Sequence, residues 1–288
     1  MQFMPKYFLI VCAFAVLNGC TNLFFYPFFY PSPEHVLKPD RLGLSYEDVF
    51  FRDAENYKIH GWFLPAQGPR KGTILFLHGN AQNISTHIGA VYWLPRAGYA
   101  VFLLDYRGYG QSEGTPSVEA ALDGIENALR LVVQDAHYSD GRVIVFAQSL
   151  GGALGIYASA HSAYRANIQA LITESAFSDY RSIVREKLAG SWITWLLHWP
   201  LSLLVTADFS PKNAIGLMRQ IPVLTIHGED DEVVSLRHAF ILNQAAQEPK
   251  ELWVLPEGRH IDAAQSEAFR QRFLGYLEKV ARPAPGNK

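Results

Sequence analysis

The residues that could carry chemistry begin with a serine at the end of an apolar run. Residues 143–148 read Val-Ile-Val-Phe-Ala-Gln, and Ser149 follows them directly, before Leu-Gly-Gly. The run predicts a buried strand, and the small residues after Ser149 predict a closely packed helix. A serine at such a sharp turn could be an exposed nucleophile, held with a backbone strain of roughly 1–3 kcal/mol. The alternative is a serine that only caps the helix of an ordinary strand–helix turn.

This turn resembles the nucleophile elbow of the α/β-hydrolase family, whose pattern is G-x-S-x-G. The positions two residues before and after the serine must be small, because larger side chains would collide where the helix folds against the strand. Gly151 fits this pattern, whereas Ala147 stands in place of the first glycine. Because alanine is also small, we expect the elbow to tolerate it.

A second segment, His78-Gly79-Asn80, follows another predicted buried strand. In α/β-hydrolases this position supplies half of the oxyanion hole. The resemblance implies that the backbone N–H groups of Asn80 and Leu150 are the two donors, the latter at a helix N-terminus that favours negative charge. We expect the His78 side chain itself to be an ordered structural residue at the end of the strand.

Two later loops supply an acid and a base. Residues 227–234 read His-Gly-Glu-Asp-Asp-Glu-Val-Val and resemble the family pattern H-G-x-x-D-x-x-V, which implies Asp231 as the triad acid. Asp230 is the neighbouring alternative, and an acidic cluster after a strand can also be a solvated loop. His260 ends a glycine-containing loop after the last predicted strand. It is chosen among ten histidines because the order Ser149, Asp231, His260 is the α/β-hydrolase order.

The segment Asp-Tyr-Arg-Gly-Tyr-Gly-Gln-Ser-Glu-Gly at residues 105–114 narrows the resemblance. It is similar to the D-x-R-G-x-G-x-S-x-G loop of the Bem46-like branch of α/β-hydrolases, and the likeness covers roughly residues 45–280. We expect Asp105 and Arg107 to brace loops near the site, with no catalytic role for either.

The elements that must position these residues alternate along the chain. Residues 45–52 and 58–64 predict an antiparallel hairpin, and helices are predicted at 85–97 and 117–134. Further short, almost continuously apolar strands are expected at 73–77, 100–104, 142–147, 168–173, 223–226 and 251–255. This alternation predicts an α/β-hydrolase fold: a mostly parallel central sheet of about eight strands with helices on both faces. We expect one domain over residues 44–282, followed by a short tail at 283–288.

The alternation breaks between residues 176 and 220, which predicts a small helical cap insertion. Residues 192–205 are strongly apolar and rich in tryptophan, but Pro200 interrupts them and they are too short to span a bilayer. One interpretation is a set of buried helices packed on the sheet. The other is a cap whose apolar face lines an acyl-chain pocket or meets lipid.

The N-terminus is typical of a targeting segment. Lys6 precedes an apolar run at residues 7–17, which suits a signal peptide better than a transmembrane helix. Leu-Asn-Gly-Cys at 17–20 resembles a bacterial lipobox, so residues 1–19 are predicted to be removed and Cys20 to carry a lipid. A plain secretory leader is the alternative. Since Thr21 replaces the aspartate that favours inner-membrane retention, we expect a lipid-anchored envelope protein, facing the periplasm from the outer membrane.

Residues 20–43 are predicted as a tether between this anchor and the domain. Their first half reads Leu-Phe-Phe-Tyr-Pro-Phe-Phe-Tyr-Pro-Ser-Pro at 23–33, where the prolines prevent a regular helix and the aromatic side chains favour a membrane interface. The segment either lies along the lipid headgroups or packs on the body of the protein.

The composition of the chain excludes several classes of function and of site. The 288 residues are 49% apolar with a net charge of −2, so no basic field suggests nucleic acid. Since one of the two cysteines lies in the leader, neither a disulfide nor a thiolate metal site is expected. No dinucleotide or phosphate-binding motif implies a cofactor, and we expect none and no metal. The prediction is a monomeric serine hydrolase acting on acyl esters or thioesters. A small-peptide serine peptidase and a non-catalytic envelope protein are the alternatives.

Overall fold

The computed structural model describes residues 28–190 and 194–281 of the chain. The predicted leader, Cys20, the first part of the predicted tether and the predicted tail at 283–288 lie outside the described residues. Within the described ranges, no helix combines the length and the apolar character that crossing a membrane requires.

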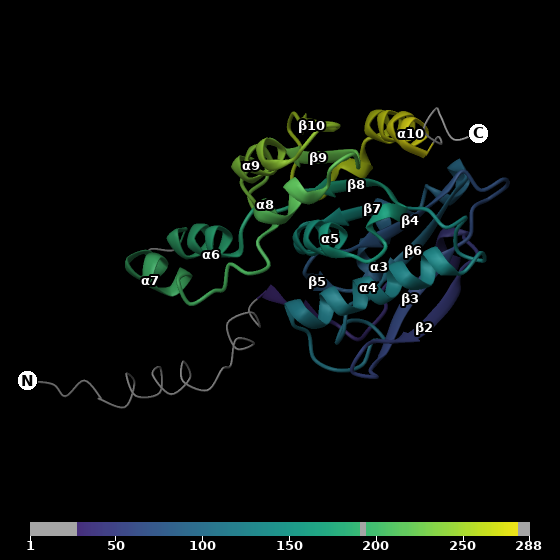
Figure 1. Ribbon diagram of the computed structural model, residues 1–288, viewed down its shortest axis with the longest axis horizontal. Helices are drawn as coiled ribbons and strands as arrows, with labels where there is room; N and C mark the ends of the chain where they lie inside the picture. Colours follow the sequence, from purple (N-terminus) through teal and green to yellow (C-terminus); the bar gives the residue numbers. More distant parts are fainter. Residues whose placement is uncertain (1–27, 191–193, 282–288) are drawn as a thin grey trace, which may run out of the picture.

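Eight strands form one sheet, in the order β10-β9-β8-β7-β4-β6-β3-β2 (Figure 1). Strand β3 is antiparallel to both of its neighbours, and all other neighbouring strands are parallel. The strands of this sheet are β2 (Glu47–Arg52), β3 (Lys58–Leu64), β4 (Gly72–Leu77), β6 (Tyr99–Leu104), β7 (Val143–Gln148), β8 (Ile168–Glu174), β9 (Val223–Gly228) and β10 (Lys250–Leu255). The predicted mostly parallel sheet and its N-terminal hairpin are confirmed.

Helices cover both faces of the sheet, and the side chains of each central strand alternate between two apolar cores. In β4, Leu75 and Leu77 face one core, whereas Ile74 and Phe76 face the other. Near-continuous apolar strands are what a sheet buried on both faces requires. The α-helices are α3 (Ile84–His87), α4 (Val118–Gln134), α5 (Leu150–His161), α6 (Tyr180–Ala189), α7 (His198–Ser202), α8 (Pro211–Ala214), α9 (Arg237–Ala245) and α10 (Glu267–Ala281). The first core includes residues of α4 and α5, and the second includes residues of α3 and α10.

The helix predicted at 85–97 is wrong in its length. The structure has only the short α3, followed by 3₁₀ helices at Ile88–Ala90 and Pro95–Ala97. Gly89 weakens an α-helix, and Pro95 cannot donate a backbone hydrogen bond and clashes with the carbonyl four residues earlier. The apolar spacing is nevertheless kept, because Ile84, Ile88 and Leu94 are buried.

The described part of the predicted tether lies on the body of the fold. The short strand β1 (Tyr30–Pro31) pairs with β5 (Ala81–Gln82), which directly follows the His-Gly-Asn loop. Phe29 is only 2% exposed. A 3₁₀ helix at Pro39–Leu42 then leads to β2. Phe28 and Phe29 therefore pack on the protein, whereas the side chain of Tyr30 is exposed.

The cap stands away from the sheet. Figure 1 shows α6 and α7 projecting from the main body, whereas α8 lies close to α5. A 3₁₀ helix at Trp195–Leu197 joins the two cap helices. Several large apolar side chains here are exposed rather than buried: Trp195, Leu196, Leu197, Trp199, Leu201, Leu203 and Leu204. The interpretation of this segment as helices buried against the sheet is therefore wrong.

Candidate active site

Ser149 occupies the turn between β7 and α5 with a strained backbone. Its φ is +52° and its ψ is −117°, a conformation that favours glycine. The first turn of α5 lies directly against the end of β4. A Cβ atom added at Gly151 would lie 2.3 Å from the carbonyl oxygen of His78 and 2.4 Å from that of Leu77. Only glycine fits at position 151, as the elbow pattern requires.

The structure brings Ser149, His260 and Asp231 into one hydrogen-bonded chain. Ser149 Oγ lies 3.0 Å from His260 Nε2, and His260 Nδ1 lies 2.9 Å from Asp231 Oδ2. Since a carboxylate only accepts, His260 Nδ1 carries a proton and Nε2 is free to accept one from the serine. Asp230, the alternative acid, is exposed to solvent.

Further donors hold Asp231 in its loop. The backbone N–H groups of Val233 and Val234 donate to Asp231 Oδ1 at 2.8 and 2.9 Å, and His227 Nε2 lies 3.3 Å from Oδ2. Burial alone would raise the pKa of Asp231. The hydrogen bonds from His227, His260 and Val234 outweigh burial and lower this pKa well below its usual value. Asp231 is therefore a carboxylate at neutral pH, as its partnership with His260 requires.

The His-Gly-Asn loop is fixed by its own histidine. His78 Nδ1 donates to the carbonyl oxygen of Gly79 at 2.6 Å. That oxygen belongs to the peptide that carries the Asn80 N–H, and a planar trans peptide points its N–H away from its carbonyl. Burial, with the nearby His87, lowers the pKa of His78 to about 3, so its ring is neutral. The side chain thus sets the direction of the proposed oxyanion donor.

Three tyrosines hold the same loop from outside. Tyr106 Oη donates to the His78 carbonyl at 2.9 Å, and Tyr109 Oη donates to the Asn80 carbonyl at 2.6 Å. The backbone N–H of Tyr30, in β1, donates to the Asn80 carbonyl as well, at 3.1 Å. The loop at 105–114 therefore supports the His-Gly-Asn loop through Tyr106 and Tyr109, which the sequence interpretation did not identify.

Asp105 and Arg107 brace surrounding segments. Asp105 is fully buried; it accepts from the Ile84 N–H at 3.0 Å and lies 2.9 Å from His60 Nδ1. Arg107 Nε donates to Asp53 at 2.8 Å, and its Nη1 lies 2.8 Å from Glu55. Neither side chain touches the serine–histidine pair in the described contacts.

Glu174 is a buried residue of the site that sequence interpretation missed. Its carboxylate accepts from Gln148 Nε2 at 2.7 Å and from the Ala263 N–H at 3.1 Å, and its carbonyl accepts from the Ser149 N–H at 2.9 Å. Burial raises the pKa of Glu174. The residue joins the elbow to the loop after His260. Its only sequence signal is an acidic residue at the end of an apolar strand.

The serine opens into a largely apolar cavity. The cavity has a volume of about 560 Å³, within the range of ligand pockets. Its lining combines the elbow and oxyanion loop with the cap and the N-terminal segment: Phe28, Tyr30, Asn80, Ser149, Leu150, Phe177, Ile183, Val184, Lys187, Leu188, Leu201, Leu204, Val205, Val233 and Val234. Ser149 and both proposed oxyanion residues therefore share one cavity with the cap.

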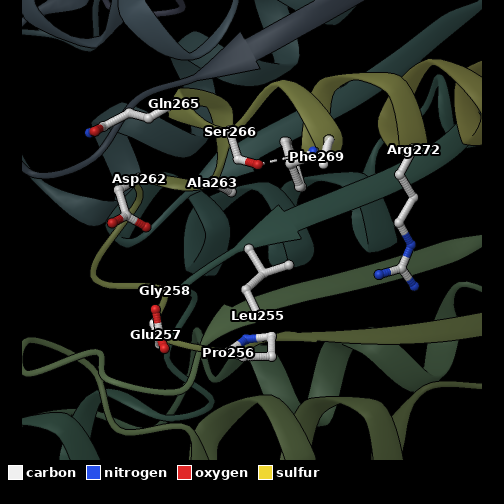
Figure 2. Close-up of a pocket in the computed structure, with 11 residues that line it drawn as sticks. Leu255, Pro256, Glu257, Gly258, Asp262, Ala263, Gln265, Ser266, Phe269 and Arg272 are labelled. Carbon is white, nitrogen blue, oxygen red and sulfur yellow. Dashed lines mark hydrogen bonds between the residues drawn. The ribbon is translucent and has the colours of Figure 1, made fainter.

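A second cavity, of about 410 Å³, borders the histidine loop on another side (Figure 2). It lies between Pro256–Gly258 and the start of α10, where Ser266, Phe269 and Arg272 form the opposite wall. Ser149, Asp231 and His260 are absent from its described lining. Of these three residues, Ser149 alone is among the described residues that line the larger cavity.

Among the described residues, one group could hold a metal ion. Ligand atoms of His35, His60 and Asp105 lie within 4.8 Å of one another. His60 Nδ1 and His35 Nε2 lie 2.9 and 3.4 Å from Asp105 Oδ2, and His60 Nε2 lies 2.9 Å from Asp48. Hydrogen bonds within the group account for its geometry, and it is separate from the triad.

Known proteins resemble this chain in sequence and in fold. A family model described as "Serine aminopeptidase, S33" matches residues 68–220. The protein YfhR of Escherichia coli K12 is 33% identical, over 94% of this chain and 92% of its own. Protein bem46 of Schizosaccharomyces pombe is 27% identical, over 88% and 84%. Among solved structures, the Pyrococcus furiosus esterase Pf2001 superposes with a TM-score of 0.68 at 19% identity, covering 88% of this chain and 97% of the esterase.

Proposed function

This chain belongs to the α/β-hydrolase superfamily, within its Bem46-like relatives, and we propose that it is a serine hydrolase of acyl esters or thioesters. One observation carries the proposal. An unbroken hydrogen-bonded chain from Asp231 through His260 to Ser149 ends in an apolar cavity that also receives Asn80 and Leu150. This arrangement is suited to acyl transfer.

In the proposed mechanism, His260 Nε2 takes the Ser149 proton as the oxygen attacks the acyl carbonyl carbon. Asp231 holds the ring in the tautomer that leaves Nε2 free, and it stabilises the imidazolium that forms. The N–H groups of Asn80 and Leu150 stabilise the oxyanion. His260 then gives the proton to the leaving alcohol or thiol, and an acyl-enzyme remains on Ser149. Water activated by the same histidine releases the acid.

The cavity's chemistry favours an acyl chain as substrate. Of the described residues that line it, Lys187 is the only charged one, and most of the others are aliphatic or aromatic. Burial of apolar surface, at roughly 25 cal/mol per Å², would favour binding of an acyl chain. A carboxylic ester or thioester with an aliphatic acyl group therefore fits better than a polar substrate.

A small-peptide serine peptidase is the second candidate, because the matching family model carries the description of an aminopeptidase. An aminopeptidase recognises the substrate's α-ammonium group, which a carboxylate would bind. The described cavity lining contains no aspartate or glutamate, and its one charge is positive. A non-catalytic envelope protein is the third candidate, and the assembled Ser149–His260 pair disfavours it.

We propose that the hydrolase works at the cell envelope, anchored through a lipid on Cys20. The Leu-Asn-Gly-Cys motif at 17–20 and the apolar run before it support this location. Replacement of Cys20 by alanine, followed by cell fractionation, tests the anchor. Protein that still sediments with membranes in the same amount would show that the lipid is not what holds it there.

Two measurements test the activity. A fluorophosphonate reagent should label the wild-type protein and leave Ser149→Ala unlabelled, since only an activated serine reacts. A panel of p-nitrophenyl esters of increasing chain length, acyl thioesters and aminoacyl p-nitroanilides should then show turnover of the acyl substrates. Preferential cleavage of the anilides would establish the peptidase instead, and labelling of Ser149→Ala equal to wild type would remove Ser149 as the nucleophile.

A further inference from the structure

The cap carries several exposed apolar side chains. Trp195, Leu196, Leu197, Trp199 and Leu203 make up what we call the cap surface, and each is at least half exposed. Leu196 is 79% exposed. Exposed patches of this kind mark sites of interaction with proteins or membranes.

A basic side chain lies against the cap surface, and no acidic residue follows nearby in the sequence. The sequence has no acidic residue between Lys187 and Asp208. The guanidinium group of Arg185 lies 3.6 Å from the ring centroid of Trp199. Glu186, the acidic residue nearest in sequence on α6, faces away: its carboxylate lies 3.3 Å from both Ser235 Oγ and His238 Nε2 on the body side. Tryptophan together with basic residues is typical of protein segments that lie at a membrane–water interface.

The N-terminal segment enters the structure at the base of the cap. The Phe28 ring lies 5.5 Å from that of Tyr180, the first residue of α6, and 6.4 Å from that of Phe177. Phe28 and Tyr30 also line the Ser149 cavity. Seven residues lie between Cys20 and Phe28, so even a fully extended chain spans at most about 28 Å over its eight steps, at roughly 3.5 Å per step. A lipid on Cys20 would therefore hold this cavity close to the bilayer surface.

We propose that the cap surface docks on the lipid bilayer and turns the entrance of the Ser149 cavity towards the membrane, so that acyl substrates enter from lipid. This inference rests on the proposed function for the substrate and on Cys20 for the anchor. The cap surface and the anchor then make two separate contacts with one membrane. Leu201 and Leu204 of the cap line the cavity, so the docked surface is continuous with the acyl site.

A second copy of the chain is a less suitable partner for this surface. In a two-fold dimer the same patch meets itself, so each copy would bring its Arg185 and Lys187 against those of the other. A bilayer that contains anionic headgroups instead offers the opposite charge to these basic residues.

The test uses the full chain, processed and reconstituted into vesicles of phosphatidylethanolamine and phosphatidylglycerol whose acyl chains carry bromine, which quenches tryptophan fluorescence. Leu196→Glu/Leu203→Glu changes two exposed residues outside the cavity lining. Val36→Glu/Phe240→Glu is the matched control, because these side chains are also exposed and apolar and lie outside the cap. Hydrolysis of a soluble short-chain ester and of a long-chain ester in the vesicles is measured in parallel.

We expect bromolipid quenching in the wild type and the control pair, and its loss in the cap pair. Turnover of the vesicle-borne ester should fall about tenfold or more in the cap pair, because two apolar side chains no longer enter lipid. Soluble ester turnover should be unchanged. If wild-type fluorescence is not quenched, or if the cap pair is quenched equally, docking is wrong. A wild-type dimer that the cap pair dissociates would also overturn it. Quenching as expected without hydrolysis of either ester would support docking while refuting the proposed esterase.

Discussion

The Cβ of Ala147 faces the bare Cα of Gly155, so that a Cβ atom added at Gly155 would lie 3.0 Å from it. This contact explains how the elbow tolerates alanine where the family pattern has glycine. Strand β7 and helix α5 still approach closely, because the residue without a side chain at this contact is Gly155 on the helix instead of a glycine at position 147 on the strand. Gly155 would also meet Leu77 Cδ1 at 3.0 Å, so little room remains.

Gly155→Ala should therefore destabilise the protein by about 1–3 kcal/mol, because the added methyl overpacks the strand–helix contact. Ala147→Gly/Gly155→Ala should recover at least part of this loss, which a double-mutant cycle of urea unfolding would measure. Gly124→Ala in α4 is the control. A Cβ there meets nothing within 4 Å, so the change should raise stability by about 0.5–1 kcal/mol through helix propensity. Additive effects at 147 and 155 would contradict the contact.

Ser149→Gly should be inactive, and it should be more stable than Ser149→Ala. Glycine adopts the +52° φ of this residue without the strain that a side chain causes, so we expect a free energy of unfolding about 1 kcal/mol above that of Ser149→Ala. Both variants lack the hydroxyl, so the comparison isolates the backbone. Denaturant unfolding of the two proteins measures it, and equal stabilities would mean that the elbow stores no strain.

Asp231→Asn should lower kcat/KM by about 10⁴, because the amide holds His260 in the wrong tautomer. Asp230→Asn is the matched control: it changes the adjacent, exposed aspartate and should stay within about twofold of wild type. Ester hydrolysis by both variants settles the identity of the acid. If the larger loss followed Asp230→Asn, the assignment within this loop would be reversed.

Asp105 should make stability depend on pH in the acid range. Burial alone would raise the pKa of Asp105, but hydrogen bonds with His35 and His60 and the nearby His78 lower it to about 2. A folded-state pKa below the unfolded value of 3.8 stabilises the folded form above pH 3.8, and this contribution is lost as the pH falls towards 2. By linkage it amounts to about 2 kcal/mol at neutral pH.

Asp105→Asn should therefore be less stable than wild type by about 2 kcal/mol at pH 7, with the difference shrinking between pH 4 and pH 2. Urea unfolding across this range measures the difference. Asp40→Asn serves as the control, because Asp40 is exposed and its change should leave the pH profile of wild type intact. A stability gap for Asp105→Asn that stayed constant down to pH 2 would mean that packing, and not charge, is lost.

The sheet and the triad could be predicted because each has a local signal. Buried strands such as 73–77 are continuous apolar runs, and the elbow requires small residues at fixed distances from Ser149. The loops that carry Asp231 and His260 each follow such a strand, so the parallel sheet brings their ends together. Chain order and strand ends are thus sufficient to place these three side chains near one another.

The supporting contacts lack such a signal, because they form only after distant segments meet. Glu174 and Gln148 are buried between the elbow and the histidine loop, yet each looks like an isolated polar residue in the sequence. The orientation of the cap likewise could not be predicted from the sequence. Its apolar composition is the same whether it covers the sheet or faces outward, and periodicity does not distinguish the two.

The pairing of β1 with β5 has a practical consequence for shortened forms of this protein. A chain shortened to begin at residue 44 would keep every residue of the triad, but it would lose the Tyr30 N–H that holds the Asn80 carbonyl and the Phe28 wall of the cavity. Such a protein would fold around an intact nucleophile and acylate poorly. A chain that begins at Phe28 would keep both contacts.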